Sequence, residues 1–238
     1  MIMEASVSKE RKQAFILNQS NLKKIWDLLE ERIGPVSAEI SCADGIHREF
    51  SNWKQFTLFD NPRQKKIISL SMNARADNWS KSVHLRFSKS SWENIELRIK
   101  GTEQVVSRLN DDINDIVDGI RPWYSKLARI DFGYVIAFLY GSIFMCIGRK
   151  FLNETKETDK GPSSEKLFLW FVFFVCGFAI VFCLSWLLNK LKTRVFPIAT
   201  FALGQGEQRY HLDEKIRWTI VIGFIVSLIA SLVVSLFI

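Results

Sequence analysis

Three stretches of this 238-residue sequence contain no charged side chain, and they limit the possible fold more than any other feature. They cover residues 132–148, 167–188 and 218–238. An α-helix rises about 1.5 Å per residue, so about 20 residues cross the hydrocarbon core of a bilayer, which is about 30 Å thick. The second and third stretches meet this length, and the first lies near its lower limit. We therefore predict three transmembrane helices.

The alternative to a bilayer is the interior of a soluble protein, where such helices would be buried by other parts of the chain. A core helix of a soluble protein carries a polar stripe, whereas in LFLWFVFFVCGFAIVFCLSWLL the only polar side chain is Ser185. A helix that is apolar all round is buried either in a large protein or in a membrane. A chain of 238 residues is too small to surround three such helices with protein. The expected solvent is therefore a lipid bilayer.

The N-terminal segment MIMEASVSKERKQAFI does not resemble a secretory signal peptide, because it has early acidic residues and no apolar core. Of the four cysteines, only Cys42 lies outside the apolar stretches, so we expect no disulfide framework. We therefore place residues 1–121 in a reducing cytoplasm. We then expect the whole chain to be a multi-pass protein of the cell (inner) membrane.

Residues 1–121 show the pattern of an α+β domain, and we expect this domain to act in sensing or interaction. Apolar stripes predict helices at 20–33, with Ser20 as N-cap, and at 102–120. A short helix is expected directly after Ser51, with Ser51 as its N-cap. Strands with period-two alternation are predicted at residues 36–42, 46–50, 68–75, 83–87 and 95–100. Such alternation indicates an antiparallel meander with one face packed against helices and the other exposed to water.

The segment 122–131 is expected to be an elbow between this domain and the membrane. Pro122 interrupts a helix, aromatic rings suit the interface between lipid and water, and basic side chains suit lipid phosphates. We assign membrane-interface roles to Trp123, Tyr124, Lys126, Arg129 and Trp218.

Two loops separate the apolar stretches, and their basic residues predict the orientation of the chain. The loop 189–217 carries six Lys/Arg and the loop 149–166 carries five. With the basic residues of the elbow added, the count places the N-terminal domain and loop 189–217 in the cytoplasm and the C-terminus outside. Apolar residues of loop 189–217, together with Pro197 and two glycines, favour an interfacial loop over a re-entrant pore segment.

Motifs for chemistry are missing from the sequence. The three histidines have no metal-ligand spacing, and no nucleophile elbow, Walker loop or dinucleotide-binding glycine motif occurs. We therefore predict no enzyme activity, cofactor or metal, and the sequence identifies no small-molecule substrate. Basic doublets such as Lys65-Lys66 suit the phosphates of nucleic acid or of lipid headgroups. The net charge of +4 over residues 1–130 favours lipid.

The apolar stretches contain no Asp, Glu, Lys or Arg, which argues against an ion-coupled carrier. Ser227, Ser231 and Ser235 recur every four residues in the third stretch. A row of small side chains lets helices approach closely. The row therefore predicts either self-association or packing within one monomer.

The order of parts, with a small α+β domain, then RPWYSKLARIDF and three spans, resembles the transmembrane effectors of bacterial anti-phage systems such as those associated with retrons. The resemblance implies a role in antiviral defence and supplies no site residue. We expect a membrane effector whose cytoplasmic domain senses a partner or ligand and whose spans then perturb the membrane. The alternative is an anchored adaptor or scaffold whose spans only tether the binding domain.

Overall fold

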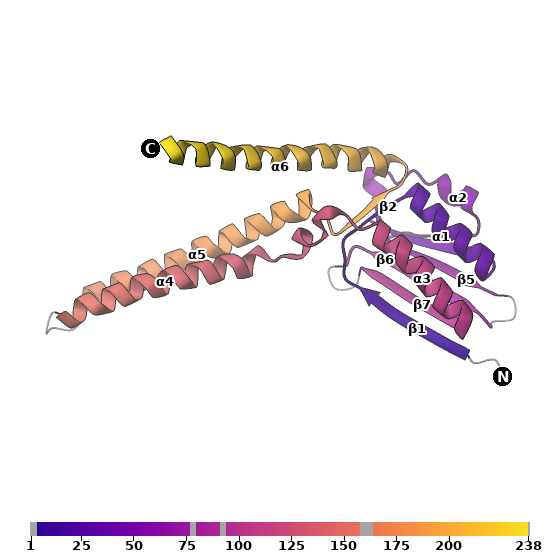
Figure 1. Cartoon of the computed structure of the whole chain (residues 1–238), viewed down its shortest axis with the longest axis horizontal. Coiled ribbons are helices and arrows are strands. Elements are labelled where there is room, and N and C mark those ends of the chain that lie inside the picture. The colour runs from indigo at the N-terminus through magenta and orange to yellow at the C-terminus, as the bar shows by residue number, and fades with distance from the viewer. Residues whose placement is uncertain (1–3, 77–79, 91–93, 158–163, 238) are drawn as a thin grey trace. The chain divides into compact units, whose positions relative to one another are not determined.

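The computed structural model describes residues 4–76, 80–90, 94–157 and 164–237. A six-stranded antiparallel sheet lies at the centre of the N-terminal part, in the strand order β1-β7-β6-β5-β3-β4 (Figure 1). Its strands are β1 (Glu4–Arg11), β3 (Val36–Cys42), β4 (His47–Phe50), β5 (Ile67–Arg75), β6 (Ser82–Ser88) and β7 (Ile95–Thr102). The successive strands β5, β6 and β7 are direct neighbours, as a meander requires. The edge strand β1 was not predicted from the sequence.

Two helices, α1 (Gln19–Arg32) and α3 (Glu103–Gly119), cover one face of this sheet (Figure 1). Alternate strand residues such as Leu70, Leu85 and Leu97 point into this layer and are at most 4 % exposed. The helices bury their apolar stripes here: Leu22, Ile25, Trp26, Leu29, Val106, Leu109, Ile113 and Val117. The predicted α+β domain is therefore confirmed.

Both predicted helix caps are displaced to a neighbouring asparagine. The Oδ1 atom of Asn18, rather than Ser20, accepts the backbone N–H three residues further on at 2.8 Å. The same bond at 2.8 Å is made by Asn52, rather than Ser51, at the start of α2 (Trp53–Thr57). An N-cap needs extended backbone torsions, and both asparagines have them.

A second, two-stranded sheet joins β2 (Phe15–Asn18) to β8 (Ala199–Ala202) in parallel. β8 lies within the stretch 189–217 that the sequence suggests is an interfacial loop. That prediction is wrong, because this stretch contains the end of one long helix, a strand and the beginning of another helix. Phe201 and Leu203 are 5 % and 4 % exposed and belong to the main core of the domain.

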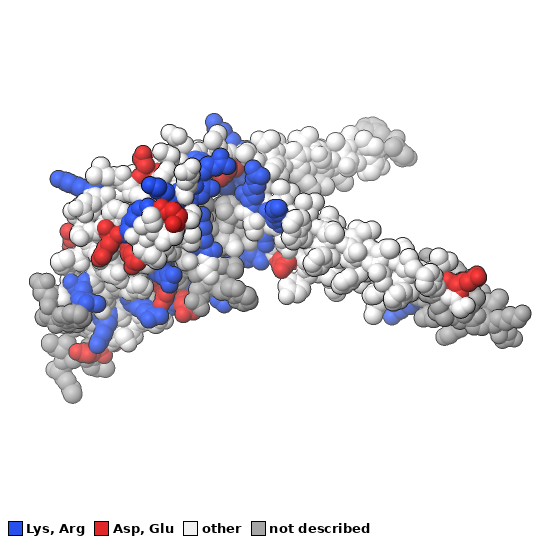
Figure 2. Space-filling model, turned by 180° about the vertical axis from the view of Figure 1, so that it is seen from behind, with Lys and Arg blue, Asp and Glu red and all other residues white. Residues whose placement is uncertain are grey.

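Three long helices complete the chain: α4 (Phe132–Glu157), α5 (Ser164–Val195) and α6 (Gln205–Phe237). Each is long and apolar enough to cross a membrane, over 132–149, 168–195 and 205–235. Charged side chains gather on the domain, and the helices are white over most of their length (Figure 2). The described part of the chain buries none of the three apolar windows, so these surfaces require a non-aqueous environment. These helices confirm the three-span region and indicate association with a membrane.

The described chain forms two compact units, residues 1–128 with 195–238, and residues 129–194. The second unit is the α4–α5 hairpin. Between its helices, the hydroxyl of Tyr140 donates a hydrogen bond to the Phe174 carbonyl at 3.0 Å. A Cβ at Gly177 would lie 2.5 Å from the same hydroxyl oxygen, so glycine permits this close approach. A polar bond inside an apolar hairpin fixes the register of its two helices.

The two ends of the hairpin are joined by hydrogen bonds. Asp131 accepts from the backbone N–H of Gly133 at 2.8 Å and from the side-chain amide of Asn189 at 2.7 Å. Lys192 donates to the Ile130 carbonyl at 2.7 Å. The bonds to Asn189 and Gly133 lower the pKa of Asp131, so its carboxylate is charged at neutral pH. The hairpin therefore begins and ends at neighbouring points.

Candidate functional site

The strand β8 and the first turns of α6 are built into the globular domain, and we call this region the junction. It comprises residues 14–18, 60–61, 121–128 and 195–218. All of these residues belong to the first compact unit. The junction contains the short 3-10 helix η2 (Trp123–Ser125) and the start of η3 (Leu127–Arg129), and η1 (Arg63–Lys65) follows residues 60–61 in the chain.

An aromatic cluster holds β2 and β8 against the main sheet. The ring of Phe15 meets Phe87 of β6 edge to face at 5.3 Å and Phe201 of β8 at 5.5 Å, measured between ring centroids. The Phe15 amide also donates to the Ile198 carbonyl at 3.0 Å. Burying a side chain of this size contributes roughly 1.5–3 kcal/mol. β8 is therefore part of the core and not a peripheral strand.

Asn61 connects the domain to both β8 and α6. Its Nδ2 atom donates to the Phe201 carbonyl at 3.0 Å, and its Oδ1 atom accepts the Ile67 amide at 3.1 Å. Its own carbonyl accepts Nη2 of Arg209 in α6 at 2.6 Å. Asn61 is 2 % exposed and has a positive φ of 48°, a conformation that asparagine tolerates better than most residues.

The turn between β8 and α6 requires glycine. Gly204 has a φ of +49°, and a Cβ there would lie 2.6 Å from the Asp60 carbonyl oxygen. Directly after it, the amide of Gln205 donates to the same carbonyl at 2.8 Å. The first residue of α6 is thus hydrogen-bonded to a loop of the domain.

Further along α6, Arg217 lies at the end of the junction and is only 2 % exposed. Its guanidinium carbon lies 5.0 Å from the ring centroid of Tyr124 and 5.4 Å from that of Tyr210. Its Nη1 atom donates a long hydrogen bond of 3.4 Å to the Val195 carbonyl at the end of α5. A desolvated cation between two aromatic rings gains a cation–π interaction of about 2 kcal/mol. Burial raises the pKa of Tyr124, and the charge of Arg217 opposes this shift.

The residues that the sequence assigns to the membrane interface differ in their exposure. Trp123 and Trp218 are 54 % and 49 % exposed, and their ring centroids lie 5.8 Å apart. Lys126 and Arg129 are also exposed. Tyr124 is only 1 % exposed and packs in a small cluster with Ala14, Ala128, Phe196 and Ile198. The ring of Tyr124 is therefore part of the core and is not exposed to a membrane interface.

The predicted association residues Ser227, Ser231 and Ser235 are all exposed on α6. The hydroxyl of Ser227 donates to the Gly223 carbonyl at 2.8 Å within the same helix. Gly223 lies one helical repeat before Ser227, so it extends this row of small residues.

Sequence reasoning missed Asn61, Gly204 and Arg217, which hold the junction together. A signal was present at Gly204 and Gly206, which the sequence suggests form a turn, although at the bilayer surface and not against the domain. Among the described residues, no group of three or more His, Cys, Asp or Glu side chains is placed to hold a metal ion. No protein-family model, curated protein or solved structure matches this chain.

Proposed function

We propose that this protein is a membrane effector in which the globular domain controls a small bundle of transmembrane helices, in defence against viruses. The observation that carries this proposal is the junction. β8 is a strand of the domain, and α6 begins three residues after it without a flexible linker. A change in the packing of the domain core therefore reaches the third apolar helix through bonded and packed groups.

Strand pairing supports a particular topology. Because β8 pairs with β2, residues 15–18 and 199–202 lie on the same side of any membrane that the chain crosses. α4 and α5 then cross it outward and back, and α6 crosses once more. The Lys/Arg distribution supports a domain in the cytoplasm of a cell whose inner membrane holds the spans.

The surface of α6 supports a role beyond anchoring. Its apolar window is not buried by the rest of the described chain. The row of Gly223, Ser227, Ser231 and Ser235 lies on one side of it, at the four-residue spacing that favours close helix contact in lipid. We infer that α6 associates with α6 of other copies when the domain is triggered.

The test measures membrane potential with a voltage-sensitive dye in bacteria that express the full chain. We expect depolarisation, and we expect Ser231→Leu to reduce it by blocking close helix approach. Val233→Leu is the matched control, because residue 233 lies on the opposite side of the same helix and should leave the effect unchanged. An unchanged potential at every expression level would favour the alternative, a membrane-anchored adaptor.

A second pair of variants tests the coupling itself. Four glycines inserted after Arg217 interrupt the helix between the junction and the apolar part of α6, since each glycine costs about 1 kcal/mol relative to alanine. Four alanines at the same place keep the helix continuous and nearly preserve its facing. We expect the glycine insertion to abolish depolarisation and the alanine insertion to retain most of it. Equal activity of the two would contradict control through α6.

A further inference from the structure

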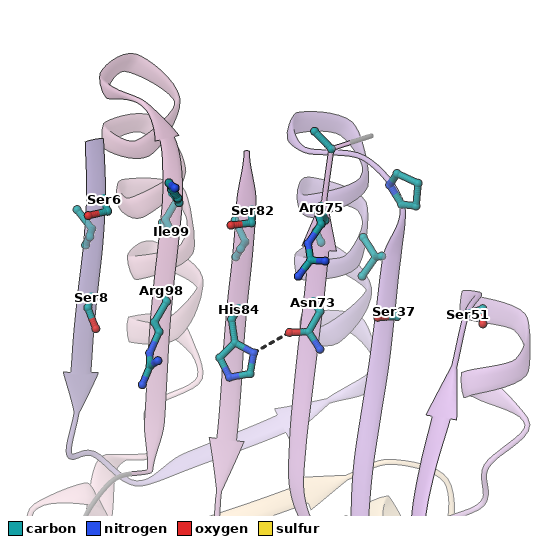
Figure 3. A pocket seen from close by; sticks show the side chains of 17 residues that line it. Ser6, Ser8, Ser37, Ser51, Asn73, Arg75, Ser82, His84, Arg98 and Ile99 are labelled. Atoms are coloured by element: carbon teal, nitrogen blue, oxygen red, sulfur yellow. Dashed lines mark hydrogen bonds between the residues drawn. The ribbon is translucent and has the colours of Figure 1, made fainter. Parts of the chain in front are cut away.

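The second face of the six-stranded sheet is not covered by the helices, which lie behind the strands in the view of Figure 3. Its residues are those that alternate with the core residues, and the strand register orders them in rows. In one row, Ser6 pairs with Lys100, Lys100 with Ser82, and Ser82 with Arg75. In the next row, Ser8, Arg98, His84, Asn73 and Ser37 are paired in that order.

These two rows line a hollow of about 930 Å³. Such a volume suits a small molecule, since ligand pockets measure about 300–1,000 Å³. Side chains of β1, β7, β6, β5 and β3, which are neighbours in that order, stand on this face (Figure 3). The polar ones are Ser6, Ser8, Ser37, Asn73, Arg75, Ser82, His84, Arg98 and Lys100, and Ser51 lies beside them.

The hollow has a positive charge. Arg75, Arg98 and Lys100 line it, and none of its described lining residues is acidic. Burial lowers the pKa of His84, so at neutral pH this ring is uncharged and the cations are the two arginines and the lysine. The next row of the face holds Glu10, Glu96, Glu39 and Glu49. Glu96 forms an ion pair with Arg98. Glu96 therefore weakens the attraction of the hollow for anions.

The hydrogen-bond donors are suitable for phosphate. His84 and Asn73 are joined through Nδ1 and Oδ1 at 2.6 Å, so the imidazole N–H donates and the Nδ2 amide of Asn73 remains as a donor. Serine hydroxyls and guanidinium groups add donors of the type that bind phosphate oxygens. His84 is the only aromatic ring among the described lining residues, so these residues offer no stacking platform for successive bases of single-stranded nucleic acid.

We propose that this hollow binds a soluble small molecule carrying two or more phosphates. Three cations arranged over two adjacent rows match several phosphate groups better than a single carboxylate. Binding of this molecule does not depend on the proposed function. The idea that the bound molecule triggers the effector does rest on the proposed function, so binding and depolarisation are measured separately.

The experiment titrates inorganic triphosphate into the full chain in neutral detergent and measures binding by calorimetry at about 0.15 M salt, where long-range attraction is screened. We expect saturable binding that the double variant Arg98→Gln/Lys100→Gln weakens by at least about tenfold. Lys24→Gln/Arg108→Gln removes the same charge from the helical face and should change the dissociation constant by less than about twofold. Glu96→Gln should tighten binding, because it releases Arg98.

Three results would overturn the proposal. The first is a failure to observe saturable binding. The second is equal weakening by the two double variants, which would reveal only a general basic surface. The third comes from repeating the titration in nanodiscs. If phosphatidylglycerol abolishes triphosphate binding that phosphatidylcholine permits, the hollow takes lipid headgroups and not a soluble compound. Because the readout is binding, a lack of depolarisation in cells leaves this test unaffected.

Discussion

Gly204 adopts a φ of +49° at the point where β8 passes into α6, and a Cβ there would overlap the backbone of Asp60. Alanine in this left-handed conformation costs about 1–2 kcal/mol before the overlap is counted. We therefore expect Gly204→Ala to lower the melting temperature of the full chain in detergent, followed by tryptophan fluorescence. Gly119→Ala is the control, since nothing lies within 4 Å of its Cβ position at the end of α3. Equal melting temperatures for the two variants would contradict this account of the junction.

The residues of the junction could not be predicted from the sequence, because their roles depend on partners that are distant in the chain. Asn61 lies in the sequence Asp-Asn-Pro, which is typical of an ordinary turn, yet its side chain donates a hydrogen bond to the Phe201 carbonyl, 140 positions away. Arg217 precedes an apolar stretch and has the position of a lipid-facing cation, yet it lies between two tyrosine rings. Local patterns do not encode such contacts.

Among the secondary-structure elements, the regular ones were predictable because their own residues determine them. The period-two alternation of β5, β6 and β7 and the stripes of α1 and α3 predicted the sheet and its helical layer. β8 was missed for a physical reason. A core and a bilayer both remove apolar side chains from water, so Phe201 and Leu203 suit either one, and hydrophobicity alone does not distinguish them.

The dependence of the domain on β8 gives a prediction about this element. A chain ending at Ala128 lacks Phe201 and Leu203, and it loses roughly 1.5–3 kcal/mol for each buried side chain. We expect this fragment to unfold more easily than a fusion that joins 1–128 to 195–217 by a short Gly/Ser linker. The linker replaces the hairpin 129–194, and Ala128 and Phe196 share one cluster, so it need not be long.

Urea denaturation of the two fragments, followed by circular dichroism, decides between them. The fusion with Phe201→Ala and Leu203→Ala is the control, because it restores chain length without restoring the core, and it should resemble the fragment 1–128. If the fragment 1–128 is as stable as the fusion, β8 makes no contribution to the domain and the proposed coupling loses its support.

For the whole molecule, the pairing of β2 with β8 requires an even number of membrane crossings between the two strands. We expect the α4–α5 hairpin to return the chain to the side from which it left, and α6 to cross alone. The N- and C-termini are therefore expected on opposite sides, with the domain in the cytoplasm. A green fluorescent protein fused to the N-terminus should fluoresce, and the same protein at the C-terminus should be dark if it is exported unfolded.

Alkaline phosphatase, which is active only after export, provides the reciprocal measurement. Fused after Ile238 it should be active, and fused after Arg217, before the apolar part of α6, it should be inactive. Activity at both points would place the junction outside the cytoplasm and overturn the orientation inferred from the basic residues. Inactivity at both would mean that α6 does not cross, and its exposed apolar surface would then have to be covered by protein on the cytoplasmic side.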